Sequence, residues 1–131
     1  MGLDNSIEIK RKDSLPNCVL CFDNDEWRKQ RGYDLEVAYW RKCWNVRAMI
    51  YELLNMPQDN DMEILMTRED VLATIKALKS INRNNFDDWG SCIWEWKELR
   101  KINRRNIKNL KRLAHMMKKH PTIEVYFYDS W

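Results

Sequence analysis

The chain has 131 residues, of which 44% are hydrophobic and 33% charged, with a formal net charge of +3 and a pI of about 8.7. This composition excludes an intrinsically disordered chain, and no apolar run reaches the roughly 18 residues that a membrane-spanning helix needs. The length predicts a single domain over residues 1–131. Because the first residues, "MGLDNSIEIKRK", are polar and unlike a secretory signal, we expect a cytoplasmic protein with reduced cysteines.

The N-terminal part of the chain carries weak structural signals. "SIEIKR" alternates Ile7 and Ile9 with polar residues, which favours a short strand. "NCVLCF" is a compact apolar run, which is typical of a buried strand. "MGLDNS" also fits the pattern for myristoylation at Gly2, although an ordinary initiator methionine followed by glycine gives the same letters, so acylation stays open.

Two helices and a strand are predicted in the middle of the chain. "LEVAYWRKCWNVRAMIYELLN", residues 35–55, repeats apolar side chains at steps of three and four, with Asp34 as the N-cap. "MEILM" predicts a short strand. Thr67 and Asp70 then form a capping-box pattern that predicts the start of a second helix, which ends near "INRNN".

A third helical region is expected from a cap at Asp87 or Asp88 to Lys119. Asn103 and Asn106 interrupt its apolar stripe, which leaves open a kink or two abutting helices. After Pro121 the segment "TIEVYFYDSW" alternates apolar and tyrosine residues, which predicts a strand. The fold class is therefore predicted as α+β: predominantly helical, with three major helices, the last long and basic, and a few short strands including the C-terminal one.

Positive charge is concentrated in one segment. Residues 97–120 contain ten Lys or Arg and one acid, a net charge of +9, whereas residues 1–96 carry −4 and residues 121–131 carry −2. On a helix these basic residues recur at steps of three and four, opposite an apolar stripe. The predicted binding surface, called the basic strip below, consists of Lys97, Arg100, Lys101, Arg104, Arg105, Lys108, Lys111 and Arg112.

The basic strip has a functional and two structural interpretations. Its cations suit the phosphates of a nucleic acid, Arg and Asn in "NRRN" suit base edges, and Trp94, one turn earlier, could stack on an unpaired base. Alternatively, the strip is an ordinary solvated helix face, or acids elsewhere neutralise it. The acids considered are Asp59, Asp61, Glu63, Asp87 and Asp88. Trp131, the last residue, either packs back on the domain or docks into a partner.

Metal-binding and catalytic signals are weak. Cys18 and Cys21 with His115 and His120 supply the ligand types of zinc, but the two pairs lie more than 90 residues apart, so their spacing does not predict a site and zinc binding stays open. Cys43 and Cys92 are expected in the core. The chain has no Gly-rich phosphate loop and no G-x-S-x-G or H-E-x-x-H motif. We therefore expect neither an enzyme nor a bound cofactor.

The sequence favours a small binding protein that engages RNA, DNA or a nucleoprotein surface through the basic strip. The alternative is a protein-interaction module, whose strip meets an acidic protein surface and whose aromatic residues anchor the partner. Such a module could be an inhibitor or adaptor from a phage or mobile element that blocks a host nucleic-acid-handling defence complex. A membrane surface is not expected, because the apolar stripe is needed for the core. Partner identity and oligomeric state stay open.

Overall fold

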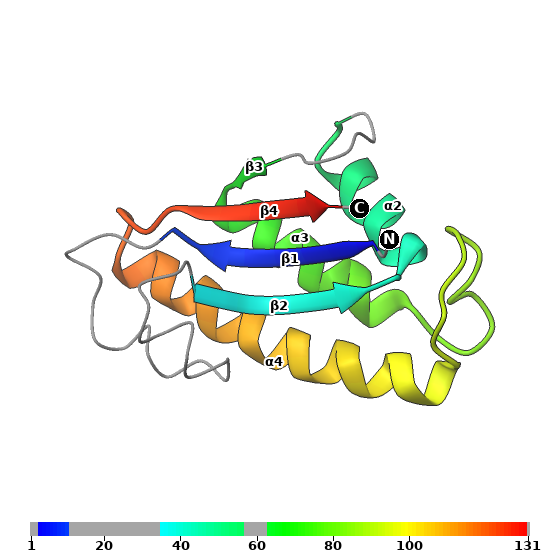
Figure 1. Cartoon of the computed structure of the whole chain (residues 1–131). Coiled ribbons are helices and arrows are strands. Elements are labelled where there is room, and N and C mark those ends of the chain that lie inside the picture. The colour runs from blue at the N-terminus through cyan, green and yellow to red at the C-terminus, as the bar shows by residue number, and fades with distance from the viewer. Residues whose placement is uncertain (1–2, 11–34, 57–62, 131) are drawn as a thin grey trace.

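The computed structural model describes residues 3–10, 35–56 and 63–130, and these form an antiparallel sheet with helices on one face (Figure 1). The strand order is β2-β1-β4-β3, which places the first and last strands of the chain side by side in the centre. In chain order the elements are β1 (Asp4–Ile9), β2 (Leu35–Arg41), α2 (Trp44–Leu53), β3 (Glu63–Met66), α3 (Arg68–Ser80), α4 (Trp96–Lys119) and β4 (Val125–Ser130).

The prediction of a predominantly helical protein is wrong. The described residues form a mixed α/β arrangement with 48% helix and 26% strand, in which three helices accompany a four-stranded sheet. The main error lies in residues 35–55, predicted as one helix. Their first part is strand β2, a left-handed residue follows at Lys42 (φ 53°), and helix α2 begins only at Trp44.

A β-bulge explains this error. The pairing of β1 with β2 shifts between Ile7 and Glu8, which face Ala38 and Glu36 respectively, so Val37 is the extra residue. Val37 and Ala38 are consequently both buried, and the alternation of period two is broken. Buried positions 35, 37, 38 and 40 then mimic the three-and-four spacing of a helix.

Other predicted elements are confirmed. Strands form at Asp4–Ile9, Glu63–Met66 and Val125–Ser130, and in the last of these Val125 and Phe127 are buried while the tyrosines face the other way. Thr67 caps α3 with a complete capping box, in which Asp70 returns the hydrogen bond. The "NCVLCF" segment lies outside the described residues.

Helix α4 is shorter than predicted and continuous. It begins at Trp96, after a stretch of turns and bends that includes Asp87 and Asp88, and it runs through Asn103 and Asn106 to Lys119 as one helix of 24 residues. The predicted cap at Asp87 or Asp88 is therefore wrong, and the two abutting helices considered for this region are one helix. These asparagines interrupt the apolar stripe because they form hydrogen bonds to strand β2.

Three buried asparagines of α4 form hydrogen bonds to strand β2, which lies at the edge of the sheet (Figure 1). The Asn106 amide donates to the Tyr39 carbonyl at 2.9 Å, and its Oδ1 accepts from the Tyr39 N–H at 3.4 Å. The Asn109 amide donates to the Val37 carbonyl at 3.0 Å. Asn103 Oδ1 accepts from the indole N–H of Trp40 at 2.9 Å. An edge strand leaves backbone groups unpaired, and these side chains satisfy some of them.

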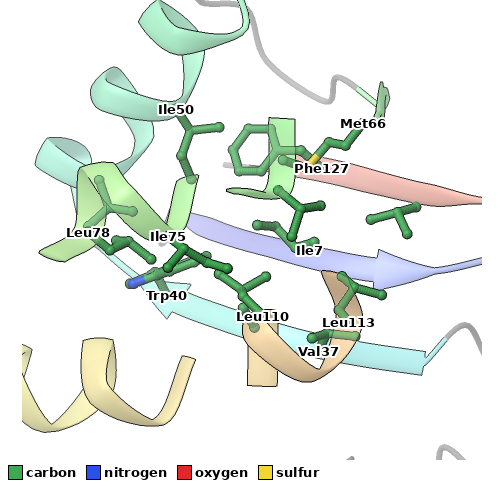
Figure 2. Close-up of a cluster of buried hydrophobic side chains, with 14 of the residues drawn as sticks. Ile7, Val37, Trp40, Ile50, Met66, Ile75, Leu78, Leu110, Leu113 and Phe127 are labelled. Atoms are coloured by element: carbon green, nitrogen blue, oxygen red, sulfur yellow. The ribbon is translucent and has the colours of Figure 1, made fainter. Parts of the chain in front are cut away.

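The hydrophobic core lies between the sheet and the three helices (Figure 2). Ile7 and Phe127 point inward from the two central strands, and side chains of α3 and α4 meet them. Trp40 is fully buried, and its one polar atom is satisfied by Asn103. The labelled core residues are Ile7, Val37, Trp40, Ile50, Met66, Ile75, Leu78, Leu110, Leu113 and Phe127.

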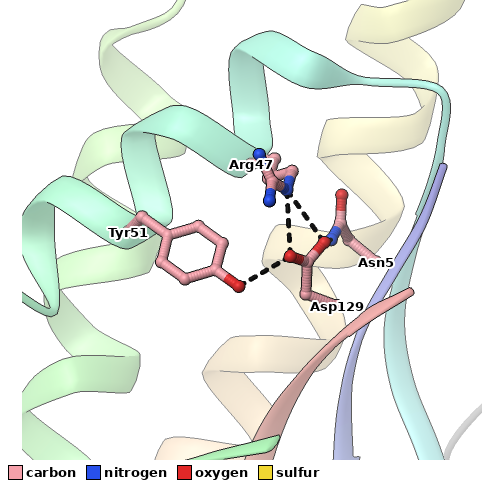
Figure 3. Close-up of polar contacts among 4 residues, drawn as sticks. All are labelled: Asn5, Arg47, Tyr51 and Asp129. Carbon is pink, nitrogen blue, oxygen red and sulfur yellow. Dashed lines mark hydrogen bonds and ion pairs between the residues drawn. The ribbon is translucent and has the colours of Figure 1, made fainter. Parts of the chain in front are cut away.

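A buried ion pair joins α2 to the central strands (Figure 3). Arg47 Nε donates to both carboxylate oxygens of Asp129, at 2.9 and 3.0 Å. The Tyr51 hydroxyl and the Asn5 amide each donate to the same carboxylate at 2.6 Å. The Arg47 guanidinium also lies 5.4 Å from the centre of the Trp44 ring. Because the carboxylate accepts from three side chains, its burial is compensated.

Candidate functional site

Helix α4 presents all eight residues of the basic strip to solvent. Each is exposed, whereas Leu99, Leu110 and Leu113 on the opposite side of the helix are fully buried. The apolar stripe packs on the core and the asparagines face β2, so the remaining surface of the helix carries the charge. At 1.5 Å per residue the 24-residue helix is about 36 Å long, and the basic strip covers about 22 Å of it.

Carboxylates of the described residues neutralise little of the strip. Lys101 pairs with Glu98 at 3.9 Å, and both side chains are more than half exposed, so this pair contributes little. Glu63 pairs with Lys10 instead, at 3.3 Å. Within residues 63–130, Asp87 and Asp88 form no ion pair with the strip. Neutralisation by these three acids is therefore not supported, while Asp59 and Asp61 lie outside the described residues.

A further cation, Lys79, joins the strip from α3. Its contact with the Lys111 amine, and secondly the charge of that amine, lower the pKa of Lys79 below its ordinary value. Two ammonium groups held this close repel each other, and an anion placed between them would relieve that repulsion. The positive surface is thus broader than α4 alone.

A groove lies between the end of α3 and the first half of α4, with a volume of about 160 Å³. Apolar side chains form part of its wall, and three cations stand around it. We call this the α3/α4 groove. Its lining residues are Leu78, Lys79, Ile81, Trp96, Arg100, Asn103, Arg104 and Ile107.

The sheet face opposite the helices carries several acids among the described residues, together with Lys10, which pairs with Glu63. Antiparallel pairing places Glu8 opposite Glu36 and Tyr126, and places Glu63 opposite Tyr128, all on that face. There the Tyr39 hydroxyl donates to Asp4, and burial together with this hydrogen bond raises the pKa of Tyr39.

The two asparagines of "NRRN" lie on the buried side of the helix and not in the strip. Asn106 uses both atoms of its amide on Tyr39, and the Oδ1 of Asn103 accepts from Trp40. Arg104 and Arg105 between them are exposed. Trp94 is half-buried, and its indole N–H donates to the Arg41 carbonyl at 3.0 Å.

Of the other residues considered in the sequence, most lie outside the described part, and His115 follows the strip on α4. Trp131, Cys18, Cys21 and Gly2 fall outside the described residues. His115 is exposed. Among residues 3–10, 35–56 and 63–130, no three His, Cys, Asp or Glu side chains are grouped to hold a metal ion. None of the helices within those ranges is long and apolar enough to cross a membrane.

No protein-family model, curated protein or solved structure matches the chain. The basic strip and the α3/α4 groove are therefore the features that support a functional proposal. Two lining residues of the groove, Lys79 and Trp96, were not among the predicted binding residues. Spacing along one helix could not reveal Lys79, because Lys79 lies on α3. Trp96 continues the apolar stripe of α4, so its position predicted a core residue.

Proposed function

We propose that the protein is a cytoplasmic, non-enzymatic binding protein that engages RNA or DNA, free or within a nucleoprotein, through the basic strip. The observation that carries this proposal is the exposure of all eight strip cations on one rigid helix, with a single weak ion pair to a described carboxylate. Arg112 also interacts within the chain, so the other seven cations carry the argument.

The energetic basis is the release of counterions from the nucleic acid. Lys and Arg that neutralise phosphates displace condensed cations, and this contribution to affinity requires no specific base contact. A continuous helix suits this role because its cations are held in a fixed row. The asparagine contacts to β2 and the buried leucines keep the helix in place, so little order has to be gained on binding.

The proposal predicts a steep dependence of affinity on salt. In fluorescence anisotropy titrations with labelled RNA and DNA, single- and double-stranded, a strip that contacts about five phosphates gives a slope of log K against log salt concentration of about −4. A slope near zero, or no binding at low salt, would overturn the proposal.

A protein-interaction module, such as an inhibitor or adaptor, is the second candidate. It is favoured by two exposed apolar side chains just before α4, Trp89 at 44% and Ile93 at 57% exposure. Tryptophan is enriched among the residues that dominate protein interfaces. An acidic protein bound there would also contact the strip, but it carries no condensed counterions, so its affinity would depend on salt less steeply than that of a nucleic acid. The same titration series, extended to a candidate acidic protein, separates the two functions.

A further inference from the structure

We propose that the α3/α4 groove receives one unpaired nucleobase, with the neighbouring phosphates on Lys79, Arg100 and Arg104, so that the preferred ligand is a single strand. This inference rests on the proposed function, because it specifies the form of nucleic acid that the same surface binds. It extends the site from α4 to α3 and makes Lys79 a binding residue.

The walls of the groove suit a planar ring. Leu78, Ile81 and Ile107 supply apolar contacts, and Trp96 supplies an aromatic ring that is half-buried. Phe86 packs against Trp96 with the ring centres 5.9 Å apart, which holds the indole in place. A cavity of roughly 150 Å³ can hold a benzene ring, and this groove measures about 160 Å³. Every base offers a π-face, so such a site tolerates any sequence.

The charged groups suit the phosphates beside that base. Arg100 and Arg104 lie one helical turn apart on α4, and Lys79 lies across from them on α3. Cations on both helices can therefore bind phosphates on each side of an inserted base. Phosphate near Lys79 also relieves its repulsion from Lys111. A duplex keeps its bases stacked and paired, so its ring faces cannot enter the groove without unstacking.

Asn103 provides a polar group in the lining. Its Oδ1 is bonded to Trp40, whereas its Nδ2 is buried and has no partner in the described part of the chain. An unpaired buried donor is unfavourable. A carbonyl oxygen or ring nitrogen on the edge of a base would satisfy it once a neighbouring side chain moves aside.

The first arm of the test compares three labelled ligands of equal length: single-stranded oligothymidine, the same backbone with abasic sites, and a duplex. Stacking of one base is worth about 1–3 kcal/mol, so oligothymidine is expected to bind about 5- to 150-fold more tightly than the abasic strand. Equal affinity for these two strands overturns the groove inference and leaves the proposed function intact. Absence of binding to all three overturns both.

The second arm uses matched variants. Lys79→Gln removes a cation of the groove, and Lys76→Gln removes an exposed cation of the same helix that does not line it. We expect several-fold weaker binding to oligothymidine for the first and no change for the second. Ile107→Phe fills the groove without changing charge and should abolish the preference for bases while binding to the abasic strand persists. Equal effects of the two lysine variants would overturn the inference.

An independent observation concerns two cysteines. Cys43 and Cys92 face each other in an isolated antiparallel bridge, with their sulfur atoms 3.6 Å apart. The Ile93 N–H donates to the Lys42 carbonyl at 3.4 Å and the Asn45 N–H to the Ser91 carbonyl at 3.2 Å, which holds the two segments in register. Both thiols are free. Directly opposed residues of an antiparallel pair have the short separation that a disulfide requires.

We infer that Cys43 and Cys92 form a disulfide when the protein meets a small disulfide oxidant such as oxidised glutathione. The Cys92 thiolate attacks the oxidant and releases one glutathione thiolate; Cys43 then attacks the Cys92 sulfur and releases the second, so that two thiols lose two electrons and two protons. The hydrogen bond between the two sulfur atoms lowers the pKa of Cys92 to about 7 and raises the pKa of Cys43, so Cys92 is the thiolate that attacks first. Cys92 is also the more exposed of the pair. The link would join the start of α2 to the segment before α4.

Peptide mass spectrometry after treatment with oxidised glutathione tests this inference. We expect a pair of peptides cross-linked through Cys43 and Cys92. The midpoint of thermal unfolding should rise by several degrees and fall back to its original value on reduction. The control Cys92→Ser should show neither change. A stable glutathione adduct on Cys92 without the cross-link, or cross-links of Cys92 to Cys18 or Cys21 instead, would overturn the inference.

Discussion

Replacing Asp129 with alanine is expected to lower the free energy of unfolding by about 3–5 kcal/mol, as breaking a buried ion pair does. Asp129 and Arg47 are 2% and 4% exposed, so the arginine left behind could not be solvated without disrupting α2. Tyr51 and Asn5 would also lose the acceptor for their donors, which adds to the loss. Urea unfolding followed by tryptophan fluorescence measures the change.

Glu63→Gln is the matched control for this experiment. It removes the carboxylate of another ion pair, with Lys10, whose side chains are about 40% exposed. Exposed pairs contribute about 0–1 kcal/mol, so the control should remain close to the wild type. A loss of similar size in both variants would show that the Asp129 network adds nothing beyond an exposed pair. Because Asp129 lies on β4 and not on α4, the folded fraction of the variant should keep the affinity of the strip.

The fold could be predicted from sequence wherever local patterns and final structure agree. Alternation identified β4, and the Thr67 capping box identified the start of α3. The prediction for residues 35–41 was wrong because a bulge opposite Ile7 and Glu8 breaks the alternation that marks a strand. Pairing with β1 decides the conformation there, and no local pattern records that pairing. One misassigned segment was enough to turn a four-stranded sheet into a predominantly helical prediction.

The basic strip and the α3/α4 groove show the same division between local and long-range information. Exposure of the basic strip follows from helical spacing alone, so it could be predicted residue by residue. The role of the asparagines could not be predicted from the sequence. A polar residue on the buried side of a helix looks like a gap in the apolar stripe unless the edge strand that it bonds to is known. Lys79 joins the surface only through the packing of α3 on α4.

Helix α4 therefore divides its circumference among three environments. Leucines meet the core, asparagines bond to the edge strand, and cations face solvent. Repulsion among like charges four residues apart destabilises the helix. The packing of the leucines on the core and the hydrogen bonds of the asparagines to β2 offset this repulsion. Apart from Arg112, which also interacts within the chain, the cations of the strip are separate from the residues that hold the helix in place, so that most of the charge can be changed without removing those contacts.

That separation makes charge reversal of the strip the sharpest test of function. Changing Arg104, Lys108, Lys111 and Arg112 to Glu alters the formal net charge from +3 to −5. Four attractive contacts with phosphate become repulsive, so affinity for nucleic acid at low salt should fall on the order of 10³-fold. All four side chains are exposed, and the variant should keep the far-UV circular dichroism of the wild type.

A matched pair of double variants separates local from overall charge. Arg104→Glu with Lys108→Glu changes the strip, whereas Lys76→Glu with Arg83→Glu changes net charge equally at exposed positions outside it. Anisotropy titrations should show a large loss of affinity for the first double variant and a small loss for the second. At 0.1 M salt, screening limits the interactions of exposed charges to a range of about 10 Å. Equal losses would mean that net charge alone governs binding. An unchanged affinity in the fourfold variant would instead assign the anionic partner to another surface.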